Sequence, residues 1–408
     1  MAIFVTRRLN LPKFLMKHFN KNKKHILHLP KWYPHPADVQ NGVFIKKHIE
    51  VAAEKFDCSV VFATSAKQEM LYQIESQIDK GVFSVKVYFQ EFDHQNAIKP
   101  FIHVFRYFVA LRKGLKVAKQ KFGKPDLIHA HVLLRTGLIA WFYGIYFNIP
   151  FIVSEHWSGF INGNFDRKSP VYRKLAEFVC GRAEKIIVVS GILKEALEKL
   201  GVKNSKITVV PNVVDVLPQA ENEPLKTETD TVIFVTVADL VDEIKNISDV
   251  IKVVAQLTKS YKIEFWIVGD GEDKEKLENL ATSLAVIDKH VFFVGRKTNE
   301  EVLKILNKVD FLILNSNSET FSVVTSESLL AGKPVIATRC GGPEIFVNET
   351  NGLLIEPGNP EALKAAIVEM IGKYKSYNPE ILKSTIREKF GREAVGNKIL
   401  AVYDEIFD

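Results

Sequence analysis

The sequence predicts an α/β protein with two doubly wound parallel sheets, one in each half of the chain. Three observations predict this fold class. The chain has 408 residues, enough for two or three domains of roughly 150 residues each. Short β-branched runs alternate with helical patterns almost throughout, which favours parallel sheets with helices on their faces. Between the two sets of elements, residues 215–230 are polar and contain two prolines, which is typical of a linker.

In the first half, seven hydrophobic runs predict strands, with helical patterns between several of them. The expected strands are residues 25–29, 59–63, 82–87, 127–130, 151–154, 185–190 and 207–210, and the helices include 44–55, 101–121 and 194–200. The second half repeats this alternation. Its expected strands are 231–237, 263–268, 291–294, 311–314, 334–337 and 353–355, and its expected helices are 247–260, 273–285, 299–308, 323–331 and 360–373.

These elements divide the chain into five parts. We expect a basic N-terminal extension, a first Rossmann-like domain, a linker, a second Rossmann-like domain and a C-terminal helix, at residues 1–24, 25–214, 215–230, 231–390 and 391–408. Ligands of such folds bind outside the carboxyl ends of the strands. With two such domains face to face, the site is expected in the cleft between them.

Composition excludes several classes of protein. Apolar residues make up 47% and charged residues 25%, which excludes disordered and collagen-like chains. The three cysteines, Cys58, Cys180 and Cys340, have no zinc or disulfide spacing, so a reducing cytoplasm is expected. The most apolar stretch, residues 138–153, is interrupted by Asn148 and Pro150, and no membrane span is predicted.

Charge is distributed unevenly between the two halves. Residues 1–212 have 33 Lys+Arg against 16 Asp+Glu, or +17, whereas residues 213–408 have 22 against 32, or −10. Such asymmetry suggests that the first half faces an anionic partner. Residues 1–37 and 94–125 each contain eight basic residues and no acidic one. No zinc-finger, helix-turn-helix or RNA-binding signature accompanies these bases, so nucleic acid is not expected as a partner.

The two basic stretches leave alternatives open. Phe101, Phe105, Phe108, Leu111 and Leu115 recur at helical spacing, which predicts either a core-facing stripe with a solvated basic back or a surface that rests on anionic lipid. The extension, residues 1–24, is either an interfacial anchor, a poorly ordered segment or a consequence of start-site choice.

The densest chemical signal is residues 318–338, which follow a buried strand. Glu319 lies in the loop, and Glu327 lies one turn into the helix that begins near Val323. The free backbone N–H groups at that helix start favour an anion. The two carboxylates on either side of such an anion site are suited to accept hydrogen bonds from sugar hydroxyls.

These residues resemble the retaining glycosyltransferases of family 4, which have the GT-B fold of two Rossmann-like domains facing across a cleft. The resemblance rests on Glu319 and Glu327 with seven residues between them, on the segments 331–337 and 341–344, and on other segments in matching order. These are Trp32-Tyr-Pro, Gly42-Val-Phe, residues 125–131, Ser154-Glu-His156, residues 211–215, Val268-Gly-Asp-Gly271 and Val294-Gly-Arg296. It extends from about residue 25 to the C-terminus, and it implies that the C-terminal helix returns to the first domain.

The resemblance also implies residue roles. Glu327 would hold the ribose of a nucleotide-sugar. Glu319 would bind the transferred sugar, with the backbone amides of Phe321 and Ser322 nearby. Lys245 would neutralise the diphosphate leaving group. The loop at residues 294–297 would border the base. On the first domain, Gly42 would let backbone approach the phosphates, His131 would lie near the transferred sugar, and His156 would occupy an equivalent strand end on the acceptor side.

One position departs from the family pattern, which has Gly-Arg-Leu where this chain has Ala238-Asp239-Leu240. Because an aspartate facing a diphosphate would repel it, we expect Asp239 to point elsewhere and Arg296 to supply the missing positive charge. The departure also keeps a noncatalytic sugar-nucleotide-binding protein as an alternative. A GT-B nucleotide-sugar epimerase is the other.

Metal and dinucleotide sites are not expected. His129 and His131 share one face of a strand, a spacing that suits either a structural pair or a metal, but spacing supplies no third ligand. The Gly-x-Gly at residues 269–271 lacks the third glycine and the acid of an NAD site. No Asp-x-Asp occurs in the chain, so Lys245, helix amides and Arg296 are expected to meet the leaving-group charge without a metal or other cofactor.

We therefore expect a metal-independent retaining hexosyltransferase of bacterial-type surface polysaccharide assembly, such as lipopolysaccharide or capsule. The donor, a nucleoside-diphosphate sugar, would bind the second domain. A glycan acceptor would bind the first domain, and the net charge of +17 in residues 1–212 suggests that this acceptor is linked to a lipid. The expected location is cytoplasmic and peripheral on the inner face of the plasma membrane.

Overall fold

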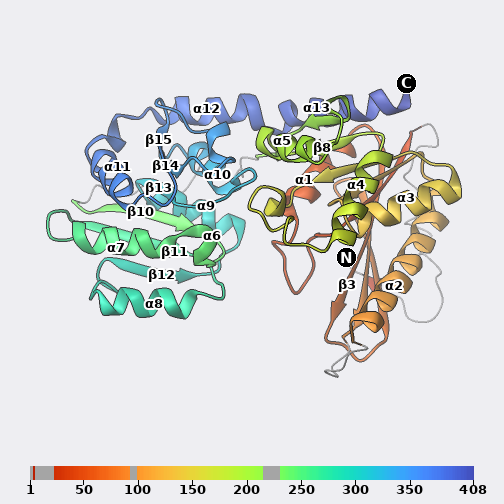
Figure 1. The fold of residues 1–408 in the computed structure, drawn as a ribbon, viewed down its shortest axis with the longest axis horizontal. Coiled ribbons are helices and arrows are strands. Elements are labelled where there is room, and N and C mark those ends of the chain that lie inside the picture. The colour runs from red at the N-terminus through yellow and green to blue at the C-terminus, as the bar shows by residue number, and fades with distance from the viewer. Residues whose placement is uncertain (1–2, 5–22, 92–98, 215–229) are drawn as a thin grey trace. The chain divides into compact units, whose positions relative to one another are not determined.

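A computed structural model of the chain describes residues 3–4, 23–91, 99–214 and 230–408 (Figure 1). The chain divides into two compact units. The first unit is Met1–Asn212 with Gly396–Asp408, and the second unit is Val213–Val395. The expected N-terminal extension and the expected linker lie almost entirely outside the described residues.

The first unit is built around a mixed sheet. Within the described residues this sheet has nine strands in the order β1-β4-β5-β3-β2-β6-β7-β8-β9. All neighbours pair in parallel except β1 with β4 and β4 with β5. The strands are β1 (Ile3–Phe4), β2 (His25–Pro30), β3 (Asp57–Ala66), β4 (Tyr72–Asp79), β5 (Val82–Gln90), β6 (Leu127–His131), β7 (Phe151–Glu155), β8 (Ile186–Val188) and β9 (Ile207–Val209).

Strand β4 was not expected, and it makes the sheet only partly parallel. It pairs antiparallel with β5 through a two-residue turn in which Asp79 faces Val82. Both turn residues, Lys80 and Gly81, have positive φ angles of 45° and 79°. A hairpin turn of this kind favours Asn-Gly or Asp-Gly, and a lysine in its first position weakens the signal in the sequence.

The helices of the first unit cover this sheet (Figure 1). They are α1 (Val43–Ala52), α2 (Lys99–Phe122), α3 (Thr136–Phe147), α4 (Pro170–Arg182) and α5 (Gly191–Lys199), with short 3₁₀ turns at Ser158–Phe160 and Asn204–Lys206. Helix α2 packs on β3 and β5 through a face of small residues. A Cβ on Gly114 would lie 2.6 Å from Cγ1 of Val61, so this face admits nothing larger at its centre.

The core-facing stripe expected on α2 is wrong for its phenylalanines. Phe101, Phe105 and Phe108 are 77%, 68% and 52% exposed. The buried face of the helix runs through Ala110 and Val117. Since Phe101 and Ala110 are nine positions apart, or about two and a half turns, they lie on opposite faces. The aromatic stripe is therefore solvent-exposed.

The second unit contains a fully parallel sheet of six strands in the order β12-β11-β10-β13-β14-β15, counted over the described residues. The strands are β10 (Val232–Val237), β11 (Ile263–Val268), β12 (Val291–Gly295), β13 (Phe311–Leu314), β14 (Val335–Thr338) and β15 (Gly352–Ile355). The helices are α6 (Asp242–Lys245), α7 (Ile247–Leu257), α8 (Lys274–Ser283), α9 (Asn299–Lys308), α10 (Val323–Leu330), α11 (Pro360–Lys373) and α12 (Pro379–Phe390), with 3₁₀ turns at Pro343–Ile345 and Tyr374–Ser376.

A compact aromatic centre supports this second sheet. The ring of Phe234 stacks on those of Phe265 and Phe311 at centroid distances of 5.5 and 4.9 Å. These three residues occupy adjacent strands, and all are fully buried. Helix α7 covers them with apolar residues at helical spacing, including Ile247 and Ile251.

Both sheets reverse their strand order at one point. In the first unit this switch point lies between β2 and β6, and in the second unit it lies between β10 and β13. The loops that leave the carboxyl ends of these strands diverge there, which leaves room for a ligand. Each unit therefore has one topologically defined place for a binding site.

The C-terminal helix, α13 (Arg392–Phe407), is assigned to the first unit from Gly396 onward. Buried Tyr403 contacts Nδ1 of His129 through its hydroxyl at 2.7 Å. Asp404 and Glu405 form ion pairs of 2.6 Å with Lys55 and Lys185. These contacts fix the last residues of the chain on the sheet and helices of the first unit.

None of the helices in the described parts of the chain combines the length and the hydropathy that crossing a membrane requires.

Candidate functional site

The switch point of the second unit brings two of the predicted site residues together. Lys245 ends α6, which follows β10, and Glu319 lies in the loop that follows β13. The ammonium of Lys245 donates to Oε1 of Glu319 at 2.5 Å. The hydroxyl of Ser316 donates to the same oxygen at 3.0 Å. Both charged side chains are largely shielded, with 21% and 14% exposure, so their attraction is only partly screened by water.

Backbone contacts hold these two loops in register. The amide of Asn317 donates to the carbonyl of Ile244 at 2.7 Å, and its side-chain amide donates to the carbonyl of Glu243 at 2.8 Å. The side chain of Asn315 donates to the carbonyl of Asn246 at 3.0 Å. Because α6 ends in Asn246 with a positive φ of 48°, the chain turns at once into α7 and leaves Lys245 at the edge of the sheet.

The loop after β14 supports Glu319 from the other side. The backbone amide of Glu319 donates to the carbonyl of Cys340 at 3.1 Å, and the carbonyl of Glu319 accepts from the amide of Gly342 at 2.8 Å. A Cβ on Gly342 would lie 2.7 Å from backbone atoms of Phe321. The Gly-Gly-Pro segment therefore has a packing role: it lets two loops approach closely enough to fix the carboxylate.

Helix α10 begins beside this carboxylate. Its N-cap, Ser322, has a positive φ of 64°, and its hydroxyl lies 2.7 Å from that of Thr325. Phe321 is buried edge-on against the ring of Phe346 at 4.8 Å. Glu327 is half-buried one turn into the helix. The structure thus gathers Lys245, Glu319 and the start of α10 at one place, and it leaves the predicted roles of these residues as predictions.

The departure at Asp239 has a partner in the structure. A guanidinium nitrogen of Arg296 lies 3.2 Å from Oδ1 of Asp239, and the two side chains are 56% and 77% exposed. Arg296 is the residue expected to supply the positive charge that the family pattern has at position 239. Its charge is therefore neutralised by Asp239 itself. An exposed pair of this kind contributes little to stability, about 0–1 kcal/mol.

The Gly-x-Gly segment after β11 is explained by packing. A Cβ on Gly269, whose φ is 151°, would lie 1.8 Å from the carbonyl oxygen of Ala238, and one on Gly271 would lie 2.6 Å from the backbone of Leu240. The amide of Leu240 donates to the carbonyl of Asp270 at 3.0 Å. The glycines bring the loops after β10 and β11 into backbone contact.

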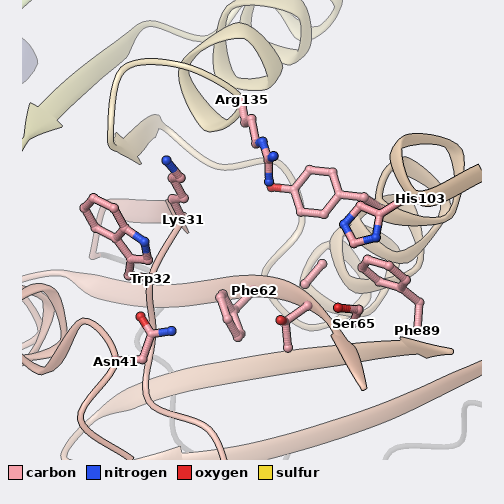
Figure 2. A pocket seen from close by; sticks show the side chains of 11 residues that line it. Lys31, Trp32, Asn41, Phe62, Ser65, Phe89, His103 and Arg135 are labelled. Carbon is pink, nitrogen blue, oxygen red and sulfur yellow. The ribbon is translucent and has the colours of Figure 1, made fainter. Parts of the chain in front are cut away.

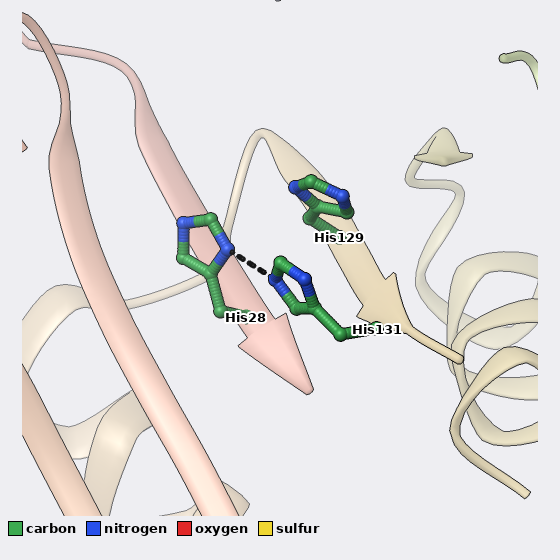
Figure 3. Close-up of side chains that lie close together, drawn as sticks. All are labelled: His28, His129 and His131. Atoms are coloured by element: carbon green, nitrogen blue, oxygen red, sulfur yellow. Dashed lines mark hydrogen bonds between the residues drawn. The ribbon is translucent and has the colours of Figure 1, made fainter. Parts of the chain in front are cut away.

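In the first unit, three imidazoles meet on β2 and β6. His28, His129 and His131 each place a ring nitrogen within 4.8 Å of the others. Nδ1 of His28 lies 3.1 Å from Nε2 of His131, as Figure 3 shows. The spacing of His129 and His131 gave no third ligand, and the structure supplies His28 from the neighbouring strand. The third imidazole that spacing along the sequence does not show is therefore supplied by the pairing of β2 with β6.

The hydrogen bonds of His129 favour a structural role for this cluster. Its Nδ1 lies 2.7 Å from the hydroxyl of Tyr403, and its Nε2 lies 2.7 Å from that of Ser154. Both ring nitrogens are thus in use, and a metal would have to displace one hydroxyl. That the protein acts without a metal stays a prediction.

Burial keeps these imidazoles neutral. Desolvation lowers the pKa of His28 to about 3, and it lowers the pKa of His131 and His156 well below the usual value. His131 is fully buried, so its predicted place beside the transferred sugar stays a prediction. His156 is also buried, at 4.8 Å from the ring of Phe44.

A carboxylate that sequence reasoning passed over organises this part of the first unit. Glu155 ends β7, is fully buried, and accepts from the amides of Leu133, His156 and Trp157 at 2.7–2.8 Å. Burial raises its pKa, while these three amides oppose the rise. The sequence does contain a signal for this role of Glu155. It is a charged residue at the end of an apolar strand, between Ser154 and His156, and a buried charge needs a hydrogen-bond partner.

Gly42, expected to approach phosphates, makes its close approach to protein backbone. It is the N-cap of α1 with a φ of 65°, and a Cβ there would lie 2.3 Å from the carbonyl oxygen of Trp32. Its role toward phosphates stays a prediction.

Sequence comparison identifies two consecutive family matches. Residues 52–216 match the profile described as Glycosyltransferase Family 4. Residues 219–381 match the profile described as Glycosyl transferases group 1. Together the two profiles cover most of both units.

Similar proteins agree with these matches. An uncharacterized glycosyltransferase of Methanocaldococcus jannaschii is 29% identical over 78% of this chain and 88% of its own length. The lipopolysaccharide core biosynthesis glycosyltransferase LpsE of Rhizobium meliloti is 29% identical over 51% of this chain and 60% of its own. Among solved structures, Anabaena HepE in complex with UDP-glucose superposes with a TM-score of 0.67 at 17% identity, over 93% of this chain and 99% of that one.

Proposed function

Since the chain belongs to glycosyltransferase family 4 and has the GT-B fold, we propose that it is a retaining hexosyltransferase. Its donor is a nucleoside-diphosphate sugar, and its acceptor is a glycan carried on a lipid. The reaction belongs to surface polysaccharide assembly on the cytoplasmic face of the membrane. The relative LpsE is named for lipopolysaccharide core biosynthesis, which supports this class of product.

The observation that carries the proposal is the Lys245–Glu319 pair at the switch point of the second unit. A diphosphate that binds there takes the ammonium of Lys245 as its counter-charge. Glu319, still held by Ser316, then accepts from hydroxyls of the transferred sugar, and Glu327 accepts from the ribose. The amides that open α10 add positive potential at the leaving group. HepE, of the same fold, binds UDP-glucose, which supports a uridine donor.

No covalent enzyme intermediate and no metal are needed in this scheme. The leaving diphosphate accepts the proton of the acceptor hydroxyl as that hydroxyl attacks the anomeric carbon from the same face. Lys245 stabilises the negative charge that develops on the diphosphate. The protein contributes position and electrostatics rather than a nucleophile.

The exposed face of α2 supports a membrane-bound acceptor. Phe101, Phe105 and Phe108 are exposed on one side of this helix, and residues 94–125, which contain it, have eight basic residues without an acidic one. Aromatic and basic residues on one helix favour the interface of anionic lipid. The first unit, at +17 for residues 1–212, is thus suited to lie on such a membrane while the acceptor enters from it.

The donor proposal is tested by thermal unfolding with UDP-, GDP- and ADP-sugars. A donor at one hundred times its dissociation constant stabilises the fold by about 2.7 kcal/mol. We expect one nucleotide class to raise the Tm of the wild type and of the surface control Glu361→Ala, but not that of Glu327→Ala. No shift of the wild type with any donor would contradict the proposal.

The membrane proposal is tested by cosedimentation with vesicles that contain anionic phospholipid. We expect binding at low salt that is lost at 0.5 M NaCl. The double variant Phe101→Ser/Phe105→Ser should release the protein, whereas Ile381→Ser, at an exposed position of the second unit, should not. Retention of the wild type at high salt would contradict an electrostatic attachment.

A second candidate function is a sugar-nucleotide-binding protein without turnover. The Asp239–Arg296 pair favours it, because the cation expected to complete the diphosphate site is neutralised. Donor binding without product, measured with competent acceptors, would select this function. Product formation would exclude it.

A further inference from the structure

A pocket of about 220 Å³ opens at the carboxyl edge of the sheet in the first unit (Figure 2). It lies at the switch point, because Lys31 and Trp32 follow β2 while Arg135 follows β6. The remaining walls come from Asn41 before α1, from β3 and β5, and from the first turns of α2. The lining residues are Lys31, Trp32, Asn41, Phe62, Ala63, Thr64, Ser65, Phe89, His103, Tyr107 and Arg135.

The pocket contains two cations and no acid. Figure 2 shows Lys31 and Arg135 along the same side of it. Across the described part of the chain, neither side chain forms an ion pair or a side-chain hydrogen bond, and the ammonium of Lys31 rests over the ring of Trp32 at 4.9 Å. Buried Glu155, whose charge acts on Lys31, accepts hydrogen bonds from three backbone amides.

The electrostatic environment of Lys31 reflects this imbalance. Burial lowers the pKa of its ammonium, and the charges of Arg135 and Lys168 lower it further, while Glu155 opposes the shift. Lys31 thus lies in the field of two further positive charges, those of Arg135 and Lys168. Binding of an anion would relieve their mutual repulsion.

The backbone at Arg135 is strained. Its φ and ψ are 68° and −71°, a γ-turn conformation that is rare for a residue with a side chain. The loop is anchored by the hydroxyl of Thr136, which donates to the carbonyls of His131 and Val132 at 2.9 and 2.7 Å. A glycine would adopt this conformation at lower cost. An arginine there is costly to the fold, and such strain is characteristic of binding and catalytic positions.

We infer that this pocket binds a phosphate monoester of the acceptor, with Arg135 and Lys31 on its oxygens. The inference rests on the proposed function and names the acceptor chemistry for it. A guanidinium engages two phosphate oxygens at once, and the ammonium supplies the second charge that a dianion needs. The hydroxyls of Thr64, Ser65 and Tyr107 line the same space. The volume of about 220 Å³ leaves room for a phosphate and part of a sugar.

The first test measures binding of phenyl phosphate by ³¹P NMR line broadening, with phenyl β-glucoside as the uncharged comparison. We expect the wild type to bind the phosphate and not the glucoside. Arg135→Gln and Lys31→Met should each weaken binding tenfold or more, the loss typical of a charge-assisted hydrogen bond. Arg182→Gln and Lys174→Met, two cations of α4 outside the pocket, should bind as the wild type does. Equal weakening in all four variants would overturn the inference.

A second variant guards against misfolding. Arg135→Gly removes the cation and relieves the backbone, so we expect an unchanged or higher Tm together with a tenfold or greater loss of phenyl phosphate binding. Unchanged binding in Arg135→Gly would overturn the inference.

Two further arms identify the source of the phosphate. One presents undecaprenyl phosphate in phosphatidylcholine vesicles, and the other presents glucose 6-phosphate in solution. Binding of either that Arg135→Gln weakens supports the inference and names the source. Binding of neither overturns it.

Donor binding separates this inference from the proposed function. The Tm shift with nucleotide-sugars is measured on the same proteins, because the donor residues lie in the second unit. A wild type that responds to a donor but not to any phosphate overturns the inference and leaves the proposed function standing. The reverse pattern supports the phosphate site and contradicts the proposed function.

Discussion

The two sheets of this protein share a strand order around their switch points but differ in the charges placed there. In the second unit, Lys245 and Glu319 form an ion pair at the switch point. In the first unit, Lys31 and Arg135 line a pocket that contains no carboxylate. The Lys245–Glu319 site presents a hydrogen-bond donor and a hydrogen-bond acceptor side by side. A sugar attached to a diphosphate needs both, the donor for its phosphate oxygens and the acceptor for its hydroxyls. The pocket of the first unit presents two cations without a carboxylate, which suits an anionic ligand. The difference shows how one topology supports two kinds of ligand through the side chains at its strand ends.

The units differ equally in their interiors. Ten of the eleven histidines precede residue 213, and only His290 follows it. Six histidines of the first unit, His25, His28, His48, His129, His131 and His156, are buried almost completely. The core of the second unit is built from stacked phenylalanines instead. We therefore expect buried histidines to make the first unit sensitive to mild acid.

Acid should produce the largest difference between the units. Desolvation lowers the pKa of His28 to about 3 and those of His25 and His48 to about 4. These imidazoles stay neutral in the folded state, whereas in the unfolded chain they take up protons below pH 6.5. Stability is thus full above pH 6.5 and falls as the pH is lowered. At pH 5 each group costs about 2 kcal/mol.

The measurement is urea unfolding at pH 7.5 and pH 5 with the variant Trp266→Phe. This change removes the tryptophan of the second unit and leaves Trp32, Trp141 and Trp157 to report on the first. A transition midpoint that does not move between the two pH values would contradict the prediction.

Loss of the Lys245 charge should have the next largest effect. With Lys245→Met, the developing charge on the diphosphate loses its counter-ion, and we expect kcat to fall about 100- to 1000-fold, as for other preorganised electrostatic groups. Lys259→Met, an exposed change in the same unit, should leave kcat unchanged. The measurement is kcat at steady state, with the donor identified by thermal unfolding. A decrease in kcat of less than tenfold would show that Lys245 does not stabilise the leaving group.

A glycine substitution tests the packing that shapes the second switch point. In Gly269→Ala the new Cβ would lie 1.8 Å from the carbonyl oxygen of Ala238 at a φ of 151°. We expect the free energy of unfolding to fall by about 2–3 kcal/mol. The matched change Gly372→Ala, in helix α11 with no neighbour within 4 Å, should raise stability by about 0.5–1 kcal/mol. Both are read from urea unfolding, and a similar result for the two would contradict the packing argument.

The Asp239–Arg296 pair should give the smallest effect. Asp239→Asn frees Arg296 to face a diphosphate, and we expect donor affinity to rise about three- to fivefold with little change in stability, because the pair is exposed. Arg296→Ala should not increase affinity. Calorimetric titration of the donor measures both variants, and unchanged affinity in both would show that Arg296 does not act on the donor.

Much of the fold follows from local pattern, and the exceptions have physical causes. The expected strands at residues 263–268 and 311–314 and the helix at 360–373 coincide with β11, β13 and α11, because a continuous apolar run or a period of 3.6 residues fixes such elements locally. The sequence pattern does not predict strands β1 and β4 or helices α3, α4, α6 and α12. In β4 the pattern is mixed and the turn residue is a lysine.

The candidate site divides in the same way. Glu319 and Glu327 are predicted from the helix start between them and from the resemblance to family 4 that their spacing supports. The third imidazole of the histidine cluster was not, because His28 and His131 are about a hundred residues apart and meet only where β2 and β6 pair. Glu155 was passed over because its three partners are backbone amides, which have no signature in the sequence.

By itself the sequence determined the two α/β halves, the uneven charge and the motifs at the strand ends, since each of these depends on residues close together along the chain. Only the tertiary structure decided which of those charges meet. It paired Lys245 with Glu319 and Asp239 with Arg296, turned the phenylalanines of α2 outward, and left Lys31 and Arg135 together without an acid. Contacts between distant residues depend on strand order and loop geometry, which no short window of sequence contains.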